Sequence, residues 1–114
     1  MNLSEYKNKL KNSPESIEFA ETMDIVDQYY SFTPTEFKNG EVVNEEGQNN
    51  GSCKLFAFAQ IQKFTKEETL MCFGKFYTKD VLENPNGDDH QNIRNFITHG
   101  WDGINFKGVA LQEK

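Results

Sequence analysis

The sequence predicts a mainly α-helical fold: a single small domain of about four or five helices, with a long polar loop and one short β pair. Three observations carry this prediction. Apolar residues recur at helical spacing, and helix-start signals precede them. Ten phenylalanines, in a chain with 13% aromatic residues, supply apolar area for one core. The length of 114 residues fits one domain, which we place at 14–114 after an N-terminal segment, 1–13.

The N-terminal part contains one clear helix. Segment 3–12 is charged and weakly amphipathic, with Leu3, Tyr6 and Leu10 at helical spacing. Ser13-Pro14 then provides an N-cap and a proline suited to the first helical position. Four apolar residues follow at the spacing of one helix face: Phe19, Met23, Val26 and Tyr30. We therefore expect a helix over 14–30.

Further helices are expected in the C-terminal part. A helix over 53–63 is apolar nearly all round and therefore belongs in the core. The capping box Thr-Lys-Glu-Glu opens a helix over 66–83, which Asn-Pro-Asn-Gly ends. An aspartate cap begins a last helix, 90–99. The tail, 101–111, is too rich in glycine for a helix, and we expect a short strand or an extended segment.

Charge and hydropathy limit the partners. The net charge is −6, with no dense basic patch, so nucleic acid is not an expected partner. No apolar run is long enough to span a bilayer, and the N-terminus lacks a signal-peptide core. We therefore expect a soluble, cytoplasmic monomer without a membrane partner, which binds a small molecule or a protein.

Cys53 and Cys72 fall in partly buried helical segments, and we expect free thiols.

The most informative segment is 37–55, which separates two predicted helices and has no apolar period. It contains three glycines and four asparagines, which enter left-handed conformations readily. Connections of roughly 15 residues without regular structure are usually functional or disordered. Asn-Gly at 39–40 also favours a small hairpin. We interpret the segment as a binding loop or, alternatively, as one whose amides only satisfy backbone groups. The candidate ligand-binding residues are Asn39, Asn44, Asn49, Ser52, Lys54, His90 and Arg94.

An enzymatic alternative centres on Cys53. Backbone N–H groups at a helix N-terminus stabilise a thiolate, and His90 could take the proton of the thiol. The alternative is thus a cytosolic housekeeping enzyme that uses Cys53 and His90 as its catalytic pair. No local signature of a cysteine enzyme surrounds Cys53, and we favour a non-enzymatic interpretation. Metal-binding pairs and the glycine motifs of nucleotide sites are absent, so we expect no metal and no cofactor.

Four strings of the chain have a familiar pattern: F-K-N-G-E-V-V-N-E-E-G-Q-N-N-G-S-C-K-L-F-A-F-A-Q, T-L-M-C-F-G-K-F-Y, D-H-Q-N-I-R-N-F and G-W-D-G-I-N-F. They resemble the HopJ family, named for a protein that plant-pathogenic bacteria deliver into host cells by type III secretion. The resemblance covers about 19–106 and leaves 1–18 outside. It implies a compact domain and an effector role, and it implies no reaction. We therefore expect a HopJ-type, non-enzymatic binding domain.

Overall fold

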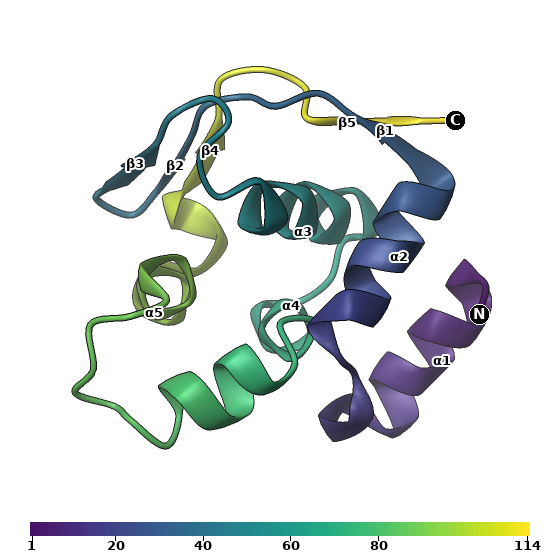
Figure 1. Cartoon of the computed structure of the whole chain (residues 1–114), viewed down its shortest axis with the longest axis horizontal. Coiled ribbons are helices and arrows are strands. Elements are labelled where there is room, and N and C mark those ends of the chain that lie inside the picture. The colour runs from purple at the N-terminus through teal and green to yellow at the C-terminus, as the bar shows by residue number, and fades with distance from the viewer.

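The computed structural model describes residues 1–114 and contains both helices and strands (Figure 1). The α-helices are α1 (Leu3–Asn12), α2 (Phe19–Tyr29), α3 (Asn50–Gln62), α4 (Lys66–Met71) and α5 (Gln91–His99). Shorter helices are the 3₁₀-helices η1 (Pro14–Ser16) and η3 (Gly100–Gly103) and the π-helix η2 (Phe76–Val81). The strands are β1 (Tyr30–Phe32), β2 (Phe37–Asn39), β3 (Val42–Asn44), β4 (Ile104–Phe106) and β5 (Leu111–Glu113).

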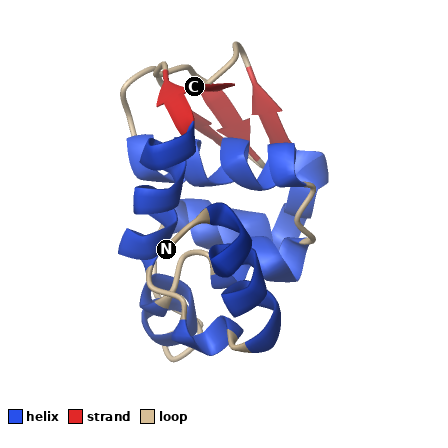
Figure 2. Ribbon diagram, turned by 90° about the vertical axis from the view of Figure 1, so that its right-hand side faces the viewer, coloured by secondary structure: helices blue, strands red, loops and turns tan.

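The strands form two small antiparallel sheets, so the fold is mixed α/β and the mainly α-helical prediction is wrong. β1 pairs with β5, and the strand order of the second sheet is β3-β2-β4. Each strand has three residues. Strands this short show no readable alternation of apolar and polar residues, which is why the sequence indicated one short β pair and not two sheets. Figure 2 shows the strands gathered at one end of the molecule, beyond the helices.

The Asn-Gly signal correctly predicted a hairpin. β2 and β3 pair with Asn39 opposite Val42, and Gly40 takes a φ of +61° in the turn. The C-terminal tail supplies the partners of the earlier strands: β4 places Phe106 opposite Phe37, and β5 lies along β1. The C-terminal tail therefore contributes one strand to each sheet.

Helix α3 lies at the centre of the core, as its all-round apolar pattern predicted (Figure 1). Phe56 and Phe58 are fully buried. The ring of Phe58 meets those of Tyr6, Tyr30 and Phe64 edge to face, with ring centroids 5.6 to 6.0 Å apart. Since Tyr6 comes from α1, the N-terminal helix contributes to the same core.

Two helices are shorter than predicted. The helix expected over 14–30 begins at Phe19, because η1 forms a separate turn before it. The helix expected over 66–83 is interrupted between α4 and η2, where Gly74 has a φ of +62°. A Cβ atom on Gly74 would lie 2.9 Å from the Ile17 carbonyl oxygen and from the Phe19 backbone nitrogen, so glycine permits this close approach. None of the helices has the length and apolar character needed to cross a bilayer.

Candidate functional site

A cleft of about 380 Å³ opens where the first turns of α3 and α5 approach an aromatic wall. Its volume is within the range of roughly 300–1,000 Å³ typical of ligand pockets. The lining comprises Asn49, Gly51 and Ser52 at the start of α3, His90, Gln91, Asn92 and Ile93 at the start of α5, Val42 of β3, and the aromatic wall, Phe19, Phe73 and Phe76. The lining thus combines aromatic rings with polar side chains.

Both helices that open on the cleft begin with a residue in the left-handed region. The caps are Asn49 (φ 52°) and His90 (φ 50°), and neither side chain bonds to its helix. Asparagine and histidine adopt this conformation more readily than most residues. The aspartate cap predicted for the last helix is therefore wrong, since His90 takes that position. The first N–H groups of a helix have no acceptor one turn back, and Gly51, Ser52, Gln91 and Asn92 of the lining occupy such positions, whereas Ile93 N–H bonds to the His90 carbonyl oxygen. The helix dipoles add partial positive charge there.

A network of four asparagines adjoins the cleft. Asn44 Oδ1 accepts hydrogen bonds from Asn49 Nδ2 at 2.7 Å and from Asn92 Nδ2 at 2.9 Å. Asn92 Oδ1 accepts from Asn44 Nδ2 at 3.0 Å and from Asn39 Nδ2 at 3.1 Å, and Asn39 Nδ2 also donates to the Asn92 carbonyl oxygen at 2.7 Å. Asn39 Oδ1 is the one buried side-chain polar atom without a partner. The network ties β2 and β3 to the starts of α3 and α5.

The π-helix η2 restrains His90 through two contacts. His90 Nε2 lies 3.1 Å from Asp80 Oδ2, and the His90 ring lies 5.2 Å from the ring of Phe76. The aromatic wall continues from Phe76 to Phe19, edge to face at 5.3 Å, and from Phe19 to Phe73, stacked at 6.2 Å. Turns of π-helix frequently occur at functional sites. Because η2 carries both Phe76 and Asp80, it holds His90 against the wall.

The structure brings some of the predicted ligand-binding residues together. Asn49, Ser52 and His90 line the cleft. Asn39 and Asn44 lie in the amide network, with 0% and 1% of their surface exposed. Their amides bond to the lining residues Asn49 and Asn92, so they hold the lining in position and are not lining residues themselves.

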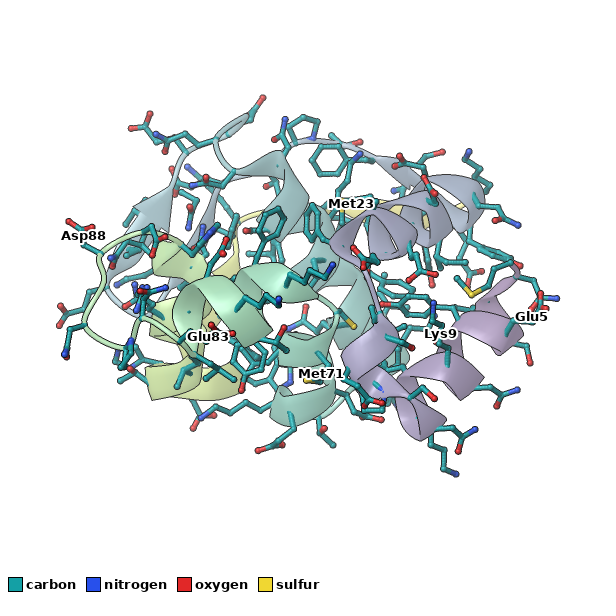
Figure 3. All side chains as sticks on the ribbon, turned by 60° about the horizontal axis from the view of Figure 1, so that its bottom comes forward. Glu5, Lys9, Met23, Met71, Glu83 and Asp88 are labelled. Carbon is teal, nitrogen blue, oxygen red and sulfur yellow. The ribbon has the colours of Figure 1, made fainter.

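Two predicted cations, Lys54 and Arg94, do not line the cleft. Lys54 Nζ pairs with Asp27 Oδ1 at 3.0 Å. The Arg94 guanidinium donates two hydrogen bonds of 2.6 Å to Asp89, one to the backbone carbonyl oxygen and one to the carboxylate. The bond to the carboxylate lowers the pKa of Asp89. Arg94 therefore holds the loop before α5. Figure 3 shows this loop, marked by Asp88, at the outer edge of the molecule.

Cys53 does not join His90 at the cleft. It is 1% exposed, it is not a lining residue, and its Sγ lies 3.8 Å from the Thr35 carbonyl oxygen. Burial raises the pKa of the Cys53 thiol, and the contact with Thr35 opposes this only in part. A thiol held neutral is a poor nucleophile. Cys72 is also buried and free, and no group of three or more His, Cys, Asp or Glu residues is arranged to hold a metal ion.

The cleft also depends on residues that the sequence did not identify. Asn92 is buried, although asparagine is mostly exposed in folded proteins. Asp80 of η2 is the partner of His90. The string D-H-Q-N-I-R-N-F holds both His90 and Asn92 and is the one signal that pointed to this part of the chain.

Comparison with known proteins gives a family and a similar solved structure. No curated protein matches the chain. A crystal structure described as that of the "unknown function protein VPA0580" has 50% sequence identity and a TM-score of 0.98, over 100% of this chain and 95% of the other. The family model of HopJ type III effector proteins matches residues 3–111, so the match includes most of segment 1–18, which we had expected to lie outside. The chain therefore belongs to the HopJ type III effector family.

Proposed function

We propose that this HopJ chain is a non-enzymatic binding domain and that a small molecule occupies the cleft between α3, α5 and the aromatic wall. One observation carries the proposal: the cleft of about 380 Å³ is lined both by aromatic rings and by polar residues at the starts of two helices. A ligand there would bury its apolar part on the wall and accept hydrogen bonds from the polar residues.

Other features support the same proposal. The buried, neutral thiol of Cys53 favours a binding role over cysteine chemistry. The net charge of −6 favours a ligand other than nucleic acid. The description of the family as type III effectors supports delivery of the chain into host cells, where the ligand would then be met.

A fragment library screened by protein-observed NMR tests the proposal. We expect bound fragments to shift the backbone amide signals of Gly51, Ser52, Gln91 and Asn92, because these groups line the cleft. The variant Ser52→Phe places a ring in the cleft and should abolish the shifts. Ser4→Phe makes the same change on an exposed residue of α1 and should preserve them.

Two outcomes would contradict the proposal. In the first, no fragment shifts the cleft amides. In the second, Ser52→Phe keeps a folded spectrum and binds the fragments as well as Ser4→Phe does, which would locate binding elsewhere on the surface.

A further inference from the structure

We infer that the ligand of the cleft is a small arene that carries an acidic group, with a carboxylic acid as the simplest case. The inference rests on the proposed function, because it names a ligand class for the same cavity. Three features of the cleft carry it: the aromatic wall, a lining without carboxylates, and a histidine held as a base.

The aromatic wall has exposed ring surface, and its three rings line both the cleft and a second cavity of about 320 Å³. Phe76 is 40% exposed, and Phe19 is only partly buried, although both belong to a ladder of rings that ends on the core residue Phe73. Aromatic rings prefer offset-stacked or edge-to-face contacts with one another. A cavity of about 380 Å³ has room for a single substituted ring against this wall.

The lining excludes carboxylates although the chain is acidic. The sequence has 18 Asp and Glu residues against 12 Lys and Arg, yet none of the acidic residues lines the cleft, and His90 is the one ionisable side chain that does. The side-chain amides of Asn49 and Asn92 already donate to Asn44. The side-chain amide of Gln91 donates to the Asp88 carbonyl oxygen. The Ser52 hydroxyl and the unpaired backbone N–H groups of the lining remain as donors. This lining favours an anionic oxygen acceptor.

His90 supplies the base. In the neutral ring, Nε2–H donates to Asp80 Oδ2 at 3.1 Å, which leaves the lone pair on Nδ1. In the imidazolium form, whose second proton comes from solvent, Nδ1–H donates to a bound carboxylate, and the ring then lies between two carboxylates. Asp89 Oδ2 is 3.9 Å from Nε2, but Arg94 pairs with the other oxygen of Asp89 at 2.6 Å. Because Phe76 and Asp80 already restrain the ring, little side-chain ordering opposes binding.

Three probes test the ligand class. Sodium benzoate carries both the ring and the charge, benzamide is its neutral isostere, and sodium acetate has the charge without the ring. Amide shifts of Gly51, Ser52 and Asn92 report binding to the full chain. We expect benzoate to bind about tenfold or more tightly than either of the others. His90→Gln should remove the advantage of benzoate over benzamide. Lys54→Ala removes a cation outside the cleft and should leave that advantage unchanged.

The outcomes separate this inference from the proposed function. Equal affinity for benzoate and benzamide, with shifts at the cleft amides, would overturn the acid class while the binding role stands. Absence of benzoate binding, when library fragments still bind in the cleft, would overturn it too. If no fragment binds, the binding role itself fails. The dispersion of the NMR signals shows whether each variant is folded. If His90→Gln is unfolded, Asp80→Asn takes its place, and it should also weaken benzoate binding.

Discussion

At the residue scale, the side chain of Asn92 joins three elements through hydrogen bonds. Its amide donates to Asn44 of β3 and accepts from Asn44 and Asn39, while Asn92 itself belongs to α5. The sequence identified Asn39 and Asn44 as polar residues of a suspected binding segment. It could not show whether their amides bond to a ligand or to one another, because an amide serves both purposes equally well. Only the packing of α5 against β2 and β3 decides this.

We predict that Asn92→Ala lowers the free energy of unfolding by about 1–3 kcal/mol, because it leaves the buried Nδ2 group of Asn44 without an acceptor and removes one of the two acceptors of Asn39 Nδ2. Urea denaturation followed by circular dichroism measures the loss. Asn95→Ala is the matched control on the same helix, where the side chain bonds only to the Gln91 carbonyl oxygen at the surface. Its effect should stay within about 0.5 kcal/mol. Similar losses in both variants would mean that the amide network adds no particular stability.

At the element scale, the sequence identified helices well and their interruptions poorly. It predicted one helix over 66–83, because Leu70, Phe73, Tyr77 and Val81 continue the helical period through Gly74. The structure ends α4 before this glycine and continues as the π-helix η2. The cause is a tertiary contact, since the backbone at Gly74 meets the start of α2. That contact also places η2 where its side chains reach His90.

A pair of glycine variants tests this explanation. Gly74 and Gly47 both have positive φ, +62° and +88°, but only Gly74 has backbone atoms close to the position of a Cβ. We predict that Gly47→Ala costs about 1 kcal/mol of stability, the usual strain of a left-handed alanine. Gly74→Ala should cost roughly 1–3 kcal/mol more, because the new methyl group meets backbone that cannot move aside. Thermal and urea denaturation measure both values. Equal losses of stability in the two variants would show that the backbone before α2 has room for a methyl group at position 74.

At the scale of the whole molecule, the sequence did not predict which strands pair over long distances along the chain. The buried helix α3 and the β2–β3 hairpin have local signals, and both were predicted. The pairing of β1 with β5, and of β2 with β4, joins residues that are 65 or more positions apart in the sequence, through strands too short to carry a period. The aromatic wall gathers Phe19, Phe73 and Phe76 in the same way. The family resemblance, by contrast, rests on long strings and was confirmed.

Burial of weak acids makes the stability of the whole molecule sensitive to alkaline pH. Burial raises the pKa of Cys72 to about 12 from its ordinary value of 9.0, and burial also raises the pKa values of Cys53 and Tyr6. The unfolded chain therefore releases these protons at lower pH than the folded chain does. Between pH 9 and pH 12 the unfolded state binds fewer protons, so the free energy of unfolding falls as pH rises.

We predict a loss of up to about 1.4 kcal/mol per pH unit for each such proton in this range, and little change from these groups below pH 8. Urea denaturation under a reducing agent at pH 8, 9 and 10 measures the slope. Cys72→Ala lowers stability at every pH, because it leaves a cavity, but it should also make the decline above pH 9 shallower, since one of the titrating groups is gone. Stability that stays constant from pH 8 to pH 10, or an unchanged slope in Cys72→Ala, would show that the thiol of Cys72 ionises in the folded chain as readily as in the unfolded one.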